Sequence, residues 1–123
     1  MRRPALKLLR PLAEAKNAEA QFYLGSLFEK GHGVIQDYRQ AAKWYQAAAD
    51  QGLQKAKIVL GSMYRNGLGV SRNFKQALKY YQPAADAGLP AAQFYLGLMY
   101  QNGQGVAQSA KEAAKWYQLA AEQ

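Results

Sequence analysis

The chain has 123 residues, 50% of them hydrophobic, which is the length of one domain with a continuous core. Sixteen Lys and Arg against eight Asp and Glu give a net charge of +8, which favours acidic partners or anionic surfaces without identifying one. Cysteine is absent, which excludes disulfides and thiolate metal sites, and no apolar run approaches the roughly 20 residues of a membrane-spanning helix.

The first ten residues carry charges too early for a signal peptide. The sequence therefore does not identify the cellular compartment. We expect a cytoplasmic protein if the chain is complete, and a periplasmic or secreted one if it is a fragment of an exported precursor.

One eleven-residue motif occurs three times along the chain. It begins at Leu24, Leu60 and Leu96, so the period is 36 residues (60 − 24 and 96 − 60). A fixed period of about 20–50 residues is typical of stacked repeat proteins. It predicts a scaffold, on which the residues that vary between repeats recognise the ligand.

The N-terminal segment falls into register with the residues two periods later. Ala5-Leu6-Lys7 matches Ala77-Leu78-Lys79, and Pro11 matches Pro83. We therefore expect a single repeat domain over 1–123, with a half repeat (a second helix) at 4–16 and full repeats at 18–51, 54–87 and 90–123.

Each full repeat starts with a predicted helix, over about 18–30, 54–66 and 90–102. In the first of these, Ala20, Leu24 and Phe28 follow helical spacing and form a core face. A glycine recurs in the middle of each helix, where it costs about 1 kcal/mol relative to alanine. Its recurrence at Gly25, Gly61 and Gly97 predicts close approach of a neighbouring helix.

Paired glycines such as Gly31 and Gly33 follow each first helix. They permit the positive φ of a helix C-cap and a tight loop. A phosphate-binding interpretation is weak, because these glycines follow a helix and lack the lysine and hydroxyl of a nucleotide-binding loop.

A second predicted helix opens at Asp37, Asn73 and Ser109, residue types that cap helix N-termini. An apolar face follows, in which tyrosines are set among alanines, and we interpret these tyrosines as core. A neighbouring column is expected to pack between successive repeats. The alternative is that the aromatic residues stack on bases or sugars. The tyrosines are Tyr45, Tyr81 and Tyr117, and the neighbouring column is Trp44, Tyr80 and Trp116.

The recurring Leu-Gly pair, Gly-x-Gly-Val loop and (Trp/Tyr)-Tyr-x-x-Ala-Ala run resemble the Sel-1-like repeat, a relative of the tetratricopeptide repeat. Departures are small: Tyr80 replaces Trp, and Lys16 stands where later repeats have Gly52 and Gly88. The resemblance implies an all-α fold, a right-handed superhelical solenoid of antiparallel helix pairs. It implies that first helices line a concave surface and that the protein is an adaptor in protein complexes. A cysteine-rich bacterial branch is linked to β-lactam binding and hydrolysis, and this chain has no cysteine.

A binding face is predicted where first helices are not needed for the core. At 100° per residue, Phe22 lies about 200° from Ala20, outside the core arc, and Ile58 and Phe94 are its equivalents. An apolar floor with variable polar walls suits an extended peptide or a partner helix. The alternative is that Phe22 and Phe94 pack against the adjacent repeat's first helix. The predicted binding residues are Phe22, Ser26, Glu29, Lys30, Lys55, Ile58, Ser62, Arg65, Asn66, Phe94, Leu98, Gln101 and Asn102.

Cations recur in two columns on the second helices and form a ladder on the expected convex face. On electrostatics alone they allow nucleic-acid binding. We expect no aromatic column among them, and therefore disfavour nucleic acid as the partner. The cations are Arg39, Lys75, Lys111, Lys43, Lys79 and Lys115.

Catalysis is the poorest hypothesis. His32 is the only histidine, so no His-based triad or multi-histidine metal site can form within one chain, and we expect no cofactor.

The sequence therefore predicts a protein- or peptide-binding adaptor. A bacterial regulatory or immunity protein is a specialised form of this prediction. The alternative from another class is an architectural spacer in a longer envelope protein, without a groove ligand. Self-association through the terminal helices also stays open, because apolar residues such as Trp116 and Leu119 lie in the last helix.

Overall fold

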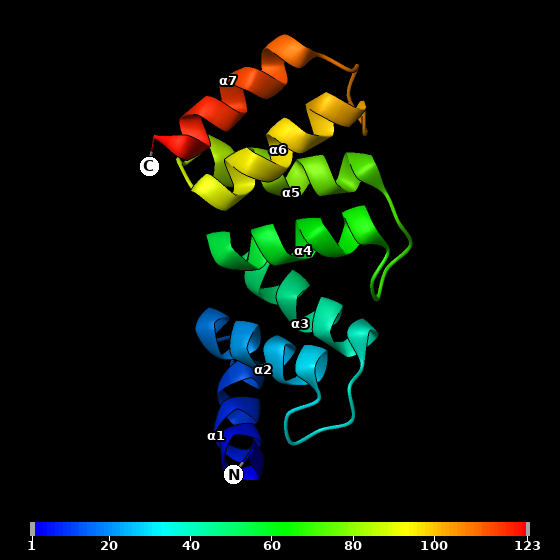
Figure 1. Ribbon diagram of the computed structural model, residues 1–123. Helices are drawn as coiled ribbons and strands as arrows, with labels where there is room; N and C mark the ends of the chain where they lie inside the picture. The colour runs from blue at the N-terminus through cyan, green and yellow to red at the C-terminus, as the bar shows by residue number, and fades with distance from the viewer. Residues whose placement is uncertain (1, 123) are drawn as a thin grey trace.

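The computed structural model describes residues 2–122, and the side chains of residues 5–122. The part of the chain so described is all-helical, and each helix packs against the next along the chain. The helices stack from α1 at the bottom of Figure 1 to α7 at the top, which confirms the predicted all-α solenoid. They are α1 (Arg2–Glu14), α2 (Ala18–Lys30), α3 (Tyr38–Asp50), α4 (Gln54–Asn66), α5 (Phe74–Asp86), α6 (Pro90–Asn102) and α7 (Ala110–Ala121).

The first helices of the repeats, α2, α4 and α6, have the predicted bounds, and each ends at the first glycine of the pair. At the end of α4, Gly67 has a φ of 69°, and its backbone N–H donates to the Met63 carbonyl. The N–H of Leu68 donates to the same carbonyl at 2.9 Å. Both bonds go to a carbonyl that the end of a helix leaves free, so the predicted C-cap is confirmed.

The second glycine of the pair brings successive repeats together. A Cβ built on Gly69 would lie 2.2 Å from the Tyr38 carbonyl oxygen, so no side chain fits there. A Cβ built on Gly105 would likewise lie 3.1 Å from the backbone carbonyl carbon of Phe74. Each of these loops therefore rests on the first turn of the preceding repeat's second helix. The loops 31–37, 67–73 and 103–109 all lie on one side of the stack (Figure 1).

The second helices, α3, α5 and α7, begin after the predicted caps. Asp37 Oδ1 accepts from the backbone N–H groups of Arg39 and Gln40 at 3.0 and 3.1 Å. Asn73 and Ser109 each accept one backbone N–H at 3.1 Å. All three predicted N-caps are confirmed.

The aromatic column on the second helices packs between repeats, as predicted. The Tyr80 hydroxyl accepts from Gln46 Nε2 of the preceding repeat at 2.7 Å. Trp116 packs in a cluster with Ala84 and Ala85, which belong to the repeat before it.

The main junctions between repeats join a second helix to the next first helix. Leu60 of α4 and Leu96 of α6 are fully buried at these junctions, against alanines of α3 and α5. The buried side chain of Gln93 donates from Nε2 to the Ala85 carbonyl at 3.2 Å. The Ala85 carbonyl, in the last turn of α5, also accepts the N–H of Gly88, so the α5–α6 junction combines apolar burial with a hydrogen bond to the end of a helix.

Lys16 adopts the left-handed conformation at the turn between α1 and α2, with a φ of 69°. The equivalent turns use Gly52 and Gly88, whose φ values are 92° and 90°. Left-handed geometry costs a residue with a Cβ about 1–2 kcal/mol. The first junction is therefore more strained than the two that follow.

We expect Lys16→Gly to raise the free energy of unfolding by about 0.5–1 kcal/mol, because the relief of strain exceeds the entropy that glycine adds to the unfolded chain. Urea unfolding followed by circular dichroism measures this. Lys16→Ala is the control, since alanine removes the charge and keeps the strain. Equal stabilisation by alanine and glycine would contradict the backbone explanation.

Candidate protein-binding face

A tyrosine of the second helix crosses the mid-helix glycine of the first helix in every full repeat. A Cβ built on Gly25 would lie 3.0 Å from the Tyr45 ring. At Gly61 and Gly97 the corresponding distances to the tyrosine ring are 2.9 and 2.8 Å. The predicted close approach is confirmed, and the group that approaches is an aromatic ring. The three crossing tyrosines are Tyr45, Tyr81 and Tyr117.

The hydroxyls of these tyrosines reach polar side chains of the first helices. The Tyr45 hydroxyl donates to Glu29 Oε1 at 2.5 Å. In the second repeat, Tyr81 and Ser62 share a hydrogen bond of 2.7 Å between their hydroxyls. In the third, Tyr117 donates to Gln101 Oε1 at 2.5 Å.

All three partners, Glu29, Ser62 and Gln101, are predicted binding residues. We call the side of α2, α4 and α6 that carries the predicted binding residues the first-helix face. The Tyr45 and Tyr81 rings are core, as expected, whereas Tyr117 is half-buried. The hydrogen bonds from the three hydroxyls to residues of this face were missed. The sequence could have predicted these hydrogen bonds, because the hydroxyl of a recurring buried tyrosine needs a polar partner and phenylalanine does not.

Burial keeps the hydroxyls of Tyr45 and Tyr81 neutral. It raises the pKa of Tyr81 to about 12, while the Ser62 hydrogen bond and the Arg65 charge act in the opposite direction. Burial, followed by the nearby Glu29, also raises the pKa of Tyr45. At neutral pH both phenols are therefore protonated, and that of Tyr45 donates to Glu29.

The predicted apolar floor packs on the crossing tyrosines. Phe22 is half-buried, with its ring centroid 5.3 Å from that of Tyr45. Phe94 packs on Tyr117 with centroids 5.6 Å apart and is 48% exposed. Ile58 is half-buried against the core cluster that contains Tyr81. Of these three, Phe94 therefore offers the largest exposed fraction.

Two predicted cations on this face bridge repeats. Lys55 Nζ lies 2.8 Å from Glu19 Oε1 of the first repeat, which raises the pKa of Lys55. The same ammonium lies 4.8 Å from the Phe22 ring centroid. Arg65 Nε donates to Gln104 Oε1 in the loop of the third repeat at 3.2 Å.

The other predicted binding residues lie on the same first helices and differ in exposure. Ser26 and Leu98 are half-buried, and Lys30, Asn66 and Asn102 are exposed in the last turn of their helices. The structure thus places the predicted residues on successive first helices, where they differ in polarity from repeat to repeat.

The expectation that no aromatic column lies among the second-helix cations is wrong. Each lysine of one column lies over the ring of the residue that follows it. The Nζ-to-centroid distances are 5.7 Å for Lys43 and Trp44, 5.7 Å for Lys79 and Tyr80, and 5.4 Å for Lys115 and Trp116. A flexible lysine stem can lie along a neighbouring ring, which brings the two columns together.

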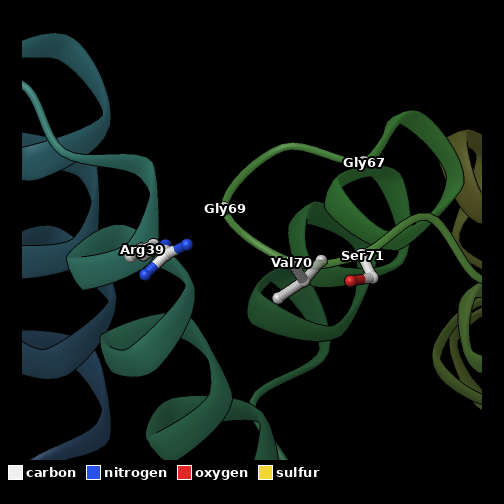
Figure 2. Close-up of a pocket in the computed structure, with 5 residues that line it drawn as sticks. All are labelled: Arg39, Gly67, Gly69, Val70 and Ser71. Atoms are coloured by element: carbon white, nitrogen blue, oxygen red, sulfur yellow. The ribbon is translucent and has the colours of Figure 1, made fainter.

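A polar hollow of about 420 Å³ lies between α3 and the loop after α4. Figure 2 shows Arg39 projecting from α3 near the loop that carries Gly69, Val70 and Ser71. Within residues 2–122, no group of three or more His, Cys, Asp or Glu side chains could hold a metal ion. Within the same range, every helix is too short or too polar to cross a membrane.

Comparison with known proteins places these features in a family. The family model described as Sel1 repeat matches residues 18–53, 54–89 and 90–123. Among curated proteins, none matches the chain.

Two solved structures resemble the chain closely. A protective antigen of uropathogenic Escherichia coli strains, which displays an SLR fold, is 44% identical with a TM-score of 0.91. A Sel1 repeat protein from Oxalobacter formigenes is 38% identical with a TM-score of 0.86. Each match covers 95% of this chain, but only 25% and 48% of those longer chains.

We expect stability to fall at alkaline pH through Tyr81. The stability contributed by the neutral phenol is full below its ordinary pKa of 10.0 and is lost as the pH rises towards about 12. Between pH 10 and 12 we expect Tyr81 to account for a loss of about 2 kcal/mol of unfolding free energy. Urea unfolding at a series of pH values measures this loss.

The comparison variants are Tyr81→Phe, which should lack that part of the alkaline decline, and Tyr38→Phe, which removes an exposed phenol and should retain it. Parallel declines in the wild type and Tyr81→Phe would show that burial of this hydroxyl does not contribute to the pH dependence.

Proposed function

The chain belongs to the Sel1 repeat family, and from this premise we propose that it is an adaptor that binds a protein or peptide on its first-helix face. Sel1 repeat proteins are in general protein-interaction scaffolds. The observation that carries the proposal is the row of tyrosine hydroxyls that reach this face, one in each full repeat.

This row combines a constant group with a variable partner. The tyrosine recurs, but its partner is a carboxylate at Glu29, a hydroxyl at Ser62 and an amide at Gln101. A ligand that runs across the repeats would therefore meet a regular apolar floor with a different polar group at each step. This arrangement suits an extended peptide or a partner helix.

Charge supports a partner that is acidic over part of its length. The chain carries a net charge of +8, and Lys30 and Arg65 lie on the first-helix face. Complementary charge would accelerate association and select the partner more than it would strengthen the final complex. Both similar structures come from bacteria, and we propose a bacterial regulatory or immunity role as the specialised form of this activity.

Site-specific photo-crosslinking in a lysate of the source organism tests the proposal. A photoreactive residue is introduced at Lys30, Asn66 or Asn102, which are exposed on the first-helix face. The matched controls carry it at Lys43, Lys79 or Lys115, which are exposed on the second helices.

We expect a common partner to crosslink from the first-helix positions and not from the controls. Equal crosslinking from both sets would place binding elsewhere. The absence of any specific crosslink would favour the architectural spacer.

A further inference from the structure

The polar hollow between α3 and the loop after α4 lies at the junction of the first two full repeats. Its volume of about 420 Å³ is within the usual range of small-molecule pockets. Both walls belong to repeats that have a neighbour on each side, so the described chain itself forms the whole hollow. We call it the junction hollow, and it is lined by Arg39, Gly67, Gly69, Val70 and Ser71.

Arg39 is the charged group of the junction hollow. Its side chain is exposed and extends from the first turn of α3 toward the loop (Figure 2). Among the side chains of residues 5–122, no acid forms an ion pair with it. The nearest acid along the chain is Asp37, whose Oδ1 accepts the backbone N–H groups of Arg39 and Gln40. The guanidinium therefore keeps its donors available for a ligand.

The loop wall of the junction hollow adds uncharged donors. Ser71 contributes a hydroxyl, and the backbone N–H groups of Gly69, Val70 and Ser71 donate to no backbone carbonyl within residues 2–122. The paired glycines alone do not form a nucleotide-binding loop, but the fold brings them to the cation of the preceding repeat. A Cβ built on Gly69 would lie 3.1 Å from the Arg39 backbone nitrogen, so the two walls are held close together.

The polar groups of this junction do not recur in the other repeats, although the glycines do. Next to Ser71, the guanidinium carbon of Arg72 lies 5.1 Å from the Phe74 ring centroid, which places a second cation beside the loop. Residues that vary on a constant scaffold are the ones available for recognition. The equivalents of Arg39, Ser71 and Arg72 are Lys75, Ala107 and Gln108 at the next junction, and Ile35 and Gln36 precede Asp37 in the first loop.

We propose that the junction hollow binds a phosphate group, either free or as a monoester of a small molecule. A guanidinium presents paired N–H donors that match two phosphate oxygens. The Ser71 hydroxyl and the loop N–H groups supply donors on the other wall, and a phosphate has enough acceptor oxygens to bond to both walls. Its charge of about −1.5 to −2 at neutral pH is balanced by Arg39 and Arg72. This site is separate from the first-helix face and goes beyond the proposed function.

The probe is O-phosphoserine, which is titrated into the isotopically labelled 123-residue chain at constant ionic strength, with amide chemical shifts as the readout. We expect the largest shifts at Arg39, Gly69 and Ser71. L-glutamate shares the amino-acid part of the probe and should bind at least about tenfold more weakly, because a carboxylate has fewer acceptor oxygens and less charge. L-serine should cause no shifts. A parallel titration with inorganic phosphate shows whether the free ion or the ester binds more tightly.

Two matched substitutions locate the site. Arg39→Gln removes the guanidinium and should weaken O-phosphoserine binding at least about tenfold. Lys75→Gln removes the equivalent cation at the next junction and should change the affinity by less than about twofold. Both side chains are exposed, so neither substitution should change the circular dichroism spectrum. Arg39→Gln should also preserve the crosslinks from Lys30 and Asn66, so the two proposals can fail independently.

Three outcomes would overturn the inference. The first is the absence of shifts in the loop 67–73 at probe concentrations up to about 10 mM. The second is equal weakening by Arg39→Gln and Lys75→Gln, which would show that the probe responds to net positive charge and not to this hollow. The third is equal affinity for L-glutamate and O-phosphoserine, which would show that the phosphate group is not what the site recognises.

Discussion

The crossing of a tyrosine ring over a mid-helix glycine is the contact on which the structure of each repeat depends. Glycine costs the first helix about 1 kcal/mol, whereas full burial of a large side chain contributes about 1.5–3 kcal/mol. This exchange is favourable at Gly25 and Gly61, whose tyrosines are fully buried, and the same crossing recurs at Gly97 with the half-buried Tyr117. Because the ring extends through the pair of helices, its hydroxyl reaches the first-helix face. One side chain thus sets the helix separation and holds a polar residue of the candidate binding face by a hydrogen bond.

The junctions between repeats extend this unit into a stack. The next first helix inserts a small alanine and a buried leucine against the preceding second helix, as Ala92 and Leu96 do against α5. The following loop then rests on the start of that second helix, where Gly105 approaches Phe74. Such nearest-neighbour contacts are typical of repeat proteins, in which each unit needs a neighbour to cover its apolar surface.

The sequence predicted the helices and caps well because local rules determine them. Helical spacing, cap residues such as Asp37 and the positive φ of paired glycines act over a few positions along the chain. Side chains that span two environments were harder to predict. Tyr81 was assigned to the core because a helical projection gives a whole side chain one direction, although its hydroxyl bonds Ser62. For the same reason the contact between Lys43 and Trp44 was missed. The partner cannot be predicted from the repeat, because the residues that form the scaffold do not specify what it binds.

A double-mutant cycle between Gly97 and Tyr117 tests the role of the crossing most directly. With Tyr117 present, Gly97→Ala should lower the free energy of unfolding by about 1–3 kcal/mol, because a Cβ there would lie 2.8 Å from the ring. In the Tyr117→Ala background the same substitution should no longer destabilise and should raise that free energy by at most about 1 kcal/mol, because alanine has the better helix propensity but its Cβ would still lie 3.2 Å from the Ala113 carbonyl oxygen. An effect of the same sign and size in both backgrounds would contradict the account.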